Sequence, residues 1–493
     1  MPLTRVSSSR TVRPPAALRL AIVLALPCAA ALTVAGTYLG KEVIALAGII
    51  ALAVGGIVLV RPIVGIAVMT ALFLLAAYPT LLQSLGFLTI NNLLGVCLLT
   101  LLVARVLATR DLSFLGTRQV ALLAVIGLLF VAAGYHGDAV FPLLVQSRGK
   151  AAILDRSDQM GHDFVVRLVF LVFFIVFVET RKDLKALFLV FMLVLYLAVP
   201  SALVNWVNGS LNHGFRAEAS LTAGSNPNRL GMICLMEVAC WWFWSLSRPG
   251  LGRRVVAMGA MSAAMVVLLA TGSRSALLGC LVLVAALQSG VRQYRVPWTA
   301  IVAGAVLAGV VIATIVPQES WERMTNFSPE QGQVGASSNR MREQTIWTGV
   351  EMVKDHPLLG FGIGRFREVS RQIYRDPYWR PPHNSILWAA TEGGLPVLGL
   401  YFLLLWFTWK DLAVVTRLAH RDPEMGHVSA AIRTIFILYV FFSFFADLYL
   451  NPITYIMIGM IFCLRRYIER VPDPRPVVVA GRRGVPVVRG AAA

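Results

Sequence analysis

Four side chains that could do acid–base or anion-binding chemistry lie beside turns between residues 216 and 383. His383 stands in PPHNS, Arg274 in TGSRS, Arg216 in FRAEAS and Arg340 in NRMRE. A neutral imidazole can take a proton from an attacking group. Guanidinium groups bind phosphate through paired, charge-assisted hydrogen bonds. These residue types predict a general base (His383) and an anion-binding group (Arg216, Arg274 and Arg340).

His383 stands at the start of a predicted helix. Pro381 and Pro382 stiffen the approach and favour a helix that begins just after them, with Asn384 as a supporting residue. The positive end of that helix disfavours an imidazolium, so we expect a neutral ring that can act as a base. A histidine in this place can also cap the helix or contact lipid headgroups, and both interpretations stay open.

The arginine turns have the composition of helix N-termini. In TGSRSALLG, Thr271 or Ser273 can cap the helix that follows, and helix N-termini bind phosphate. SNPNRLG repeats the pattern, with Asn226 as the cap, a proline next, and Asn228 and Arg229 in the first turn. The alternative is a plain turn whose arginine reaches the lipid headgroups. Arg216 and Asn228 are the further candidates beside these turns.

Glu392 lies nine residues after His383 in the same segment. At about 100° per residue it falls on the opposite face and more than two turns deeper. We therefore expect Glu392, like Glu237, to brace the bundle by pairing inside it. No carboxylate cluster has metal-ligand spacing and no CxxC pair is present, so neither a metal site nor a cofactor is expected.

The elements that must position these residues are membrane helices. The chain has 493 residues, 57% of them hydrophobic and 14% charged, with a mean hydropathy of +0.73. Apolar runs of about 20 residues recur along it, as in transmembrane helices. The net charge of +19 does not require nucleic acid, because membrane proteins gather Lys and Arg in cytoplasmic loops. The predicted fold is an all-α polytopic bundle.

About 14 spans (12–14) are predicted, and the lysines and arginines orient them. With the Arg-rich N-terminus in the cytoplasm, the strongly basic connections and the C-terminus also fall inside. The outer segments are 136–163, 208–225 and 317–383. The predicted spans are 17–38, 43–60, 63–79, 88–109, 119–135, 164–179, 186–207, 226–247, 255–271, 274–290, 297–316, 384–408, 432–449 and 452–464.

Five segments follow from this topology. They are N-terminal helices (1–199), core helices with the arginine turns (200–316), a large periplasmic loop (317–383), C-terminal helices (384–465) and a basic cytoplasmic tail (466–493). Within the loop, Ile346, Trp347, Val350 and Val353 recur at helical spacing opposite Thr348 and other polar residues. This pattern predicts an amphipathic helix on the membrane surface. The GFGIG string after it favours a flexible turn over a phosphate cradle.

The order of these motifs over roughly residues 200–410 resembles that of the O-antigen ligase and polymerase superfamily of bacterial inner membranes. The motifs are FRAEAS with SNPN, TGSRSALLG, NRMREQTIWTGVEMVKDHPLLGFGIGRF and PPHNSILWAATEGGLPVLGLYF. The resemblance implies a metal-independent glycosyltransferase that takes a glycan from an undecaprenyl diphosphate carrier outside the membrane. It implies that His383 deprotonates the acceptor hydroxyl and that Arg216 and Arg274 hold the diphosphate.

The resemblance leaves the acceptor open. A ligase would join the glycan to lipid A core or a similar glycolipid, whereas a polymerase would extend a growing lipid-linked polysaccharide. A lipid-linked oligosaccharide transporter is a third alternative, which would place ionisable residues and broken helices through mid-membrane. The expected partners are the lipid-linked glycan, the acceptor and membrane lipids, with no nucleic acid, in a multi-pass protein of the bacterial inner membrane.

Overall fold

The computed structural model describes residues 55–75, 90–140, 150–210, 216–220, 226–290, 295–314, 316, 318–325, 336–378, 380–473, 477–480 and 486–489. Contacts divide the chain into two compact units, Met1–Leu72 with Tyr78–Leu112, and Phe73–Ala77 with Ser113–Ala493. The first unit holds α5 (Ile90–Thr109) and most of α3 (Pro62–Leu74). All candidate site residues belong to the second unit, so the site lies within one unit. The five segments predicted above assign parts of the chain to the membrane or to one side of it, and this division remains a prediction.

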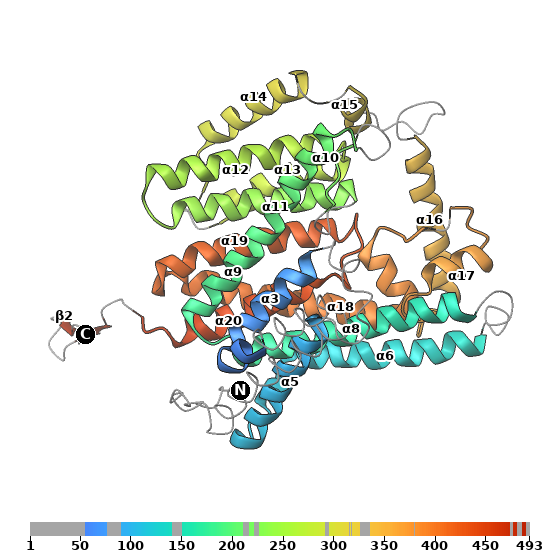
Figure 1. The fold of residues 1–493 in the computed structure, drawn as a ribbon, viewed down its shortest axis with the longest axis horizontal. Helices are drawn as coiled ribbons and strands as arrows, with labels where there is room; N and C mark the ends of the chain where they lie inside the picture. Colours follow the sequence, from blue (N-terminus) through green and yellow to red (C-terminus); the bar gives the residue numbers. More distant parts are fainter. Residues whose placement is uncertain are drawn as a thin grey trace, which may run out of the picture. The chain divides into compact units, whose positions relative to one another are not determined.

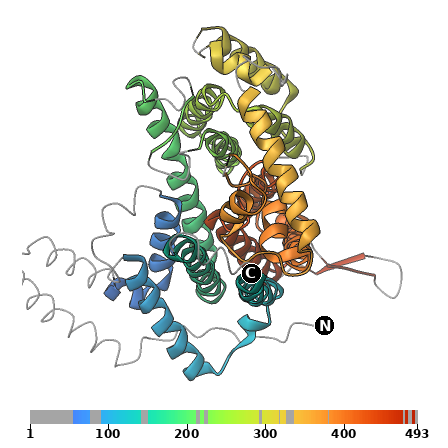
Figure 2. The same cartoon turned by 90° about the vertical axis from the view of Figure 1, so that its right-hand side faces the viewer.

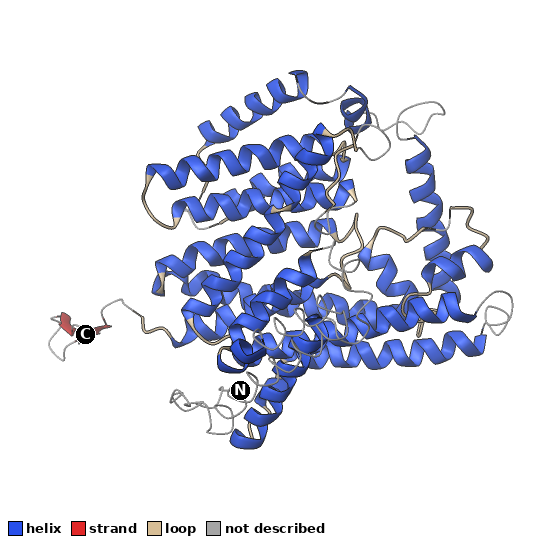
Figure 3. Cartoon of the chain, in the orientation of Figure 1, coloured by secondary structure: helices blue, strands red, loops and turns tan. Residues whose placement is uncertain are grey.

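The second unit is helical along its described length up to the C-terminal tail (Figures 1 and 3). Its helices are α6 (Arg118–Val140), α8 (Lys150–Phe177), α9 (Arg181–Tyr196), α10 (Ala198–Val207), α11 (Pro227–Leu246), α12 (Leu251–Ala270), α13 (Arg274–Gln288), α14 (Trp298–Thr314), α15 (Gln318–Thr325), α16 (Ala336–Asp355), α17 (Phe366–Gln372), α18 (Ser385–Leu418), α19 (Pro423–Phe442) and α20 (Pro452–Arg470). Two 3-10 turns, Ser113–Gly116 and Ala419–Arg421, and a short hairpin of β1 (Val477–Ala480) and β2 (Pro486–Arg489) complete it.

The all-α membrane class is confirmed. Eight helical stretches of the described residues are long and apolar enough to cross a membrane, and α3, α13 and α14 are shorter apolar helices. The count of 14 stays a prediction, since the span 17–38 and most of 43–60 lie outside the described residues. Helices α11 and α13 begin at the predicted caps. Asn226 caps α11, which has Pro227 at its first position, and Ser273 caps α13.

The outer segment 136–163 includes the end of α6, which runs to Val140, and the start of α8 at Lys150. One predicted span differs from the structure. The predicted span 432–449 is displaced: α19 runs from Pro423 to Phe442, because Asp422 accepts a hydrogen bond from the Met425 N–H (3.2 Å) and so caps a helix that begins with proline. Residues 443–451 are therefore a connection between α19 and α20, and this change matters for the site.

The long helix α18 is two helical pieces joined at the non-helical residue Gly394 (φ 74°). Pro396 has no N–H to give to the carbonyl of Glu392. The N–H of Leu395 donates to a loop carbonyl at 2.7 Å rather than to Thr391. The carbonyls of Thr391 and Glu392 thus lose their helical donors, and buried carbonyls need replacements.

The glycine-rich string supplies those replacements. The N–H of Phe361 donates to Thr391 O (3.0 Å) and that of Gly362 donates to Glu392 O (2.8 Å). Gly360 has φ 60°, and a Cβ there would lie 2.5 Å from Thr391 O, so a side chain does not fit. GFGIG is a turn, as predicted, but its backbone is fixed on the break in α18 rather than flexible.

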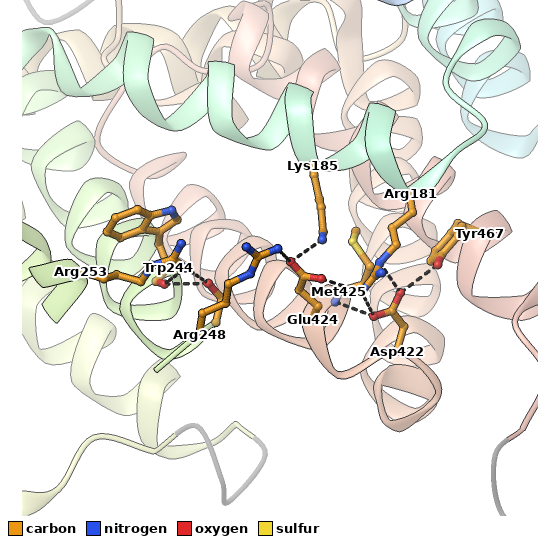
Figure 4. A network of polar contacts seen from close by, with 10 residues as sticks. Arg181, Lys185, Trp244, Arg248, Arg253, Asp422, Glu424, Met425 and Tyr467 are labelled. Carbon is orange, nitrogen blue, oxygen red and sulfur yellow. Dashed lines mark hydrogen bonds and ion pairs between the residues drawn. The ribbon is translucent and has the colours of Figure 1, made fainter. Parts of the chain in front are cut away.

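An ionic network ties helices together at the end of α18 farther from His383 (Figure 4). Arg181, at the start of α9, donates to Asp422 (2.9 Å) and Glu424 (2.8 Å) at the start of α19. Glu424 also pairs with Lys185 and, at 3.2 Å, with Arg248. Partly exposed pairs contribute about 0–1 kcal/mol each, so the network mainly fixes how these helix ends meet. Its cations come from connections predicted to be cytoplasmic.

Candidate functional site

His383 is paired with a carboxylate from another part of the chain. It lies just before α18 with φ 48°, an uncommon conformation for a residue with a side chain. Its Nδ1 is 3.2 Å from Oδ2 of Asp447 in the α19–α20 connection, and the two side chains are 26% and 14% exposed. The tautomer with the proton on Nδ1 donates to Asp447 and leaves Nε2 as an acceptor.

The capping role belongs to Asn384 and not to His383. The Asn384 side chain accepts from the N–H groups of Ile386 and Leu387, each at 3.0 Å. This bonding satisfies two of the N–H groups at the helix end. His383 precedes the cap, so its ring is available for other contacts. Asp447, within hydrogen-bond distance of Nδ1, can hold the ring in one orientation.

Ser385 holds the Asp447 connection against the start of α18. Its hydroxyl donates to the carbonyl of Ala446 (2.6 Å) and accepts from the N–H of Leu448 (2.7 Å). Its own N–H donates to the carbonyl of Ser443 (2.8 Å). Because Ser385 is fully buried and bonds both neighbours of Asp447, it sets the position of the carboxylate relative to His383.

Arg274 is the first residue of α13, directly after the turn that joins α12 to α13. The turn ends at Ser273, whose hydroxyl accepts from the Ala276 N–H (3.3 Å) as the cap. Nη1 of Arg274 donates to Oδ1 of Asn339 in α16 (2.8 Å). The beginning of α16 is therefore tied to the N-terminus of α13.

Arg216 and Asn228 meet at the same turn. Arg216 is 5% exposed; its Nε donates to the carbonyl of Thr271 (2.7 Å) and its Nη2 to Oδ1 of Asn228 (3.3 Å). The Ser273 hydroxyl also donates to Asn228 Oδ1 (2.9 Å). The FRAEAS and SNPN motifs thus lie together against TGSRS, and Arg216 positions the turn that carries Arg274.

Helix α16 packs against α17 and α18 in the second unit (Figures 1 and 2). Its Ile346 and Trp347 are 41% and 60% exposed, while Thr345, Thr348 and Met352 are buried. A helix is present over the predicted amphipathic stretch, with Ile346 and Trp347 outward. Thr348, which the pattern places opposite them, packs on the protein.

The arginines of α16 are placed differently from one another. Arg340 is exposed, and its predicted role stays a prediction. Arg342 lies one turn after Asn339 on the inward face, half-buried. Burial lowers the pKa of Arg342, the charge of Arg274 lowers it further, and the Asp447 carboxylate opposes the change. Arg342 is thus within electrostatic range of both groups.

Glu392 is fully buried and does not contact His383 in the described structure. Its Oε2 accepts from the Tyr449 hydroxyl (2.6 Å) and its Oε1 from the Phe366 N–H (3.4 Å). Tyr449 follows Asp447 in the same connection, so Glu392 braces that connection and the glycine-rich turn, in line with its bracing interpretation.

Sequence reasoning missed Asp447, Ser385 and Arg342. Asp447 was hidden because the predicted span 432–449 enclosed it, although the Asn451–Pro452 pair repeats the cap pattern of SNPN and marks a helix start. A charged residue inside a predicted span is also a functional signal by default. Arg342 stands three residues before Thr345, and this spacing places the two side chains on one face of a helix. No local sequence pattern distinguishes Ser385.

These residues can together perform proton transfer next to an anion. His383 and Asp447 form a base with an orienting carboxylate. Arg342 is within electrostatic range of Asp447 and of Arg274, and its positive charge can stabilise negative charge that develops on a leaving group. Such an arrangement suits attack by a hydroxyl group on a centre that carries a phosphate leaving group.

Residues 259–402, from α12 into α18, match the family model described as O-antigen ligase, over less than half of the chain. A comparison with curated proteins finds no match. The matched stretch contains Arg274, Arg340, His383, Asn384 and Glu392, whereas Arg216, Asn228 and Asp447 lie outside it. The resemblance derived from the motifs is confirmed over these residues, which are similar to the O-antigen ligase family.

Proposed function

We propose that this multi-pass membrane protein, with its O-antigen ligase domain, transfers a glycan from undecaprenyl diphosphate to an acceptor hydroxyl on the periplasmic face of the bacterial inner membrane. The observation that carries the proposal is the His383–Asp447 pair, with Arg342 of α16 within electrostatic range of Asp447 and of Arg274 at the start of α13. Both termini are then cytoplasmic, in agreement with the lysine and arginine distribution.

The reaction needs one proton transfer and one displacement. Nε2 of His383 takes the proton of the acceptor hydroxyl. At the same time the hydroxyl oxygen bonds to the anomeric carbon of the donor. The bond between that carbon and the diphosphate oxygen breaks, and its electron pair leaves with the diphosphate. Asp447 stabilises the imidazolium and the arginines stabilise the leaving oxygens. Arg216 adds positive charge behind Arg274 and keeps its turn in place, and Arg340 is a peripheral candidate for the same donor.

The chemistry requires neither a cofactor nor an external energy source, because the diphosphate is itself a good leaving group. We propose a metal-independent reaction on the ground that arginines supply the charge stabilisation. A lipid A core or a similar glycolipid is the proposed acceptor. Polymerisation of lipid-linked repeat units is the alternative, since the same base and cations serve either hydroxyl.

Purified full-length protein in liposomes, given a lipid-linked donor and each acceptor separately, tests the proposal. Transfer to the glycolipid alone supports a ligase, and lengthening of lipid-linked chains supports a polymerase. Absence of both, with a protein that is folded and correctly inserted, contradicts the proposed function.

Arg274 allows a second test of the same proposal. Arg274→Lys should impair transfer nearly as much as Arg274→Ala, because an ammonium group does not reproduce two parallel contacts to phosphate. Kinetics at normal protein abundance measure this effect. Transfer at the wild-type rate in Arg274→Ala would leave only the interpretation in which the arginine contacts headgroups.

A further inference from the structure

A groove between α18 and α19 lies toward the end of α18 that is farther from His383. Its volume is about 390 Å³, and its lining residues are Trp409, Leu412, Ala413, Thr416, Arg417 and Arg433. Five of them belong to the last part of α18, and Arg433 belongs to α19. The groove thus has two arginines and no acidic residue in its lining, and it takes no part in the site described above.

Neither arginine of the groove has an acidic partner among the described residues. Nη2 of Arg433 donates to the carbonyl of Ser289 (3.4 Å) and to its hydroxyl (3.2 Å). The same guanidinium lies 5.8 Å from the centre of the Trp409 ring, within the range of a cation–π contact. Arg417 is exposed, and its guanidinium has no hydrogen bond or ion pair in the part of the chain that the structure describes.

The acidic residues that flank the groove along the chain are paired with other cations. Asp411 of α18 bonds Arg465 of α20, and Glu424 of α19 bonds Lys185 of α9. The described residues therefore do not neutralise the charge of the groove. Ionisable side chains in membrane helices normally have a partner of opposite charge, so the groove has the electrostatic character of an anion site.

The groove lies where the helices reach the lipid headgroups. Arg433 bonds Ser289, which is the last residue of α13 before a connection with Arg292. Beside it in α18, the ammonium of Lys410 lies 5.0 Å from the centre of the Trp406 ring. Tryptophan and basic residues gather at the boundary between hydrocarbon and headgroups. In the predicted topology this boundary belongs to the cytoplasmic leaflet.

We propose that the groove binds an anionic phospholipid whose phosphate contacts Arg417 and Arg433. One acyl chain then follows α18 along Phe402 and Trp406, which are 46% and 53% exposed. Guanidinium groups form charge-assisted hydrogen bonds to phosphate, and basic pockets between membrane helices bind anionic headgroups. A zwitterionic lipid adds a headgroup cation that the two arginines repel. The bound lipid joins α18 to α19 at the ends opposite to His383.

Binding of phosphatidylglycerol, which is anionic, and phosphatidylcholine, which is zwitterionic, to the purified full-length protein in detergent tests the proposal. Native mass spectrometry counts the bound lipids over a titration. The wild type should prefer phosphatidylglycerol. Arg417→Gln and Arg433→Gln should each weaken its binding on the order of 10–100-fold, the range for a lost charge-assisted hydrogen bond, and leave phosphatidylcholine unaffected. If Arg433→Gln does not fold because Ser289 loses its donor, the exposed Arg417 still gives the test.

Two further variants separate a defined groove from general attraction to the basic surface. Ala413→Phe fills the groove without a change of charge, so it should also lose the preference for phosphatidylglycerol. Arg254→Gln is the matched control, since Arg254 is an exposed cation at the start of α12 and its removal changes the net charge equally. Its affinity for phosphatidylglycerol should equal that of the wild type.

Three results would overturn the proposal. They are equal affinity of the wild type for the two lipids, an equal loss in Arg254→Gln and Arg417→Gln, and undiminished phosphatidylglycerol binding in Ala413→Phe. Loss of an oligomer in Ala413→Phe, with lipid binding unchanged, would assign the groove to a second copy of the chain instead. None of these measurements depends on glycan transfer, so they test the groove separately from the proposed function.

Discussion

At the scale of single residues, the proposed chemistry depends on a pair that the sequence separates by 64 positions. In the proposed mechanism His383 is the base and Asp447 fixes its tautomer. Asp447→Asn should lower kcat while donor binding is kept, because an amide removes the charge that stabilises the imidazolium and can reverse the tautomer. We expect a loss within the range of about 10²–10⁴-fold that acid–base catalysis contributes.

A matched control exists for that substitution. Asp473 lies 3.6 Å from another histidine, His420, at the opposite end of α18. Asp473→Asn therefore removes a comparable carboxylate beside an imidazole without touching the site, and its kcat should equal that of the wild type. Equal losses in Asp473→Asn and Asp447→Asn would mean that the effect of Asp447 comes from stability rather than from chemistry.

The sequence predicted the residues whose local pattern is distinctive and missed those defined by tertiary contacts. His383, Arg274 and Asn228 stand in turns whose caps can be recognised locally. Asp447 became a candidate only when α19 was seen to end at Phe442. Arg340 and Arg342 differ by two positions, and only the packing of α16 reveals that the second one faces inward.

At the scale of elements, the site depends on the break in α18 and on the turn that fills it. Gly360→Ala should destabilise the protein by roughly 1–3 kcal/mol or more, because alanine is strained at φ 60° and its Cβ would meet Thr391 O at 2.5 Å. Transfer should fall with it, since Glu392 joins this turn to Tyr449 near Asp447. Thermal unfolding in detergent, together with the transfer rate, measures both effects.

Gly399→Ala is the control within the same helix α18. A Cβ at Gly399 meets nothing within 4 Å, and alanine is favoured over glycine in a helix interior by roughly 0.5–1 kcal/mol. This variant should unfold at an equal or higher temperature. If Gly360→Ala behaves as Gly399→Ala does, the turn is not fixed in the way that its hydrogen bonds indicate.

At the scale of the whole molecule, the helical membrane class follows from composition, and the charge distribution predicts the orientation. The two ends of α18 must then face opposite compartments. A single cysteine at Glu343, exposed on α16, should react with an impermeant thiol reagent in intact cells with a permeabilised outer membrane. A cysteine at the exposed His420 should react only after lysis. Both are made in a background without the six native cysteines, and the reverse labelling would invert the topology.

His383 is the proposed base, and other residues are proposed to bind the donor. The most direct measurement compares His383→Ala with the wild type in purified full-length protein, recording donor binding and glycan transfer in the same preparation. Transfer should fall on the order of 10²–10⁴-fold with donor affinity unchanged, while His420→Ala, at the far end of α18, should transfer normally. Transfer at the wild-type rate in a folded His383→Ala protein would contradict the role of His383 as the base.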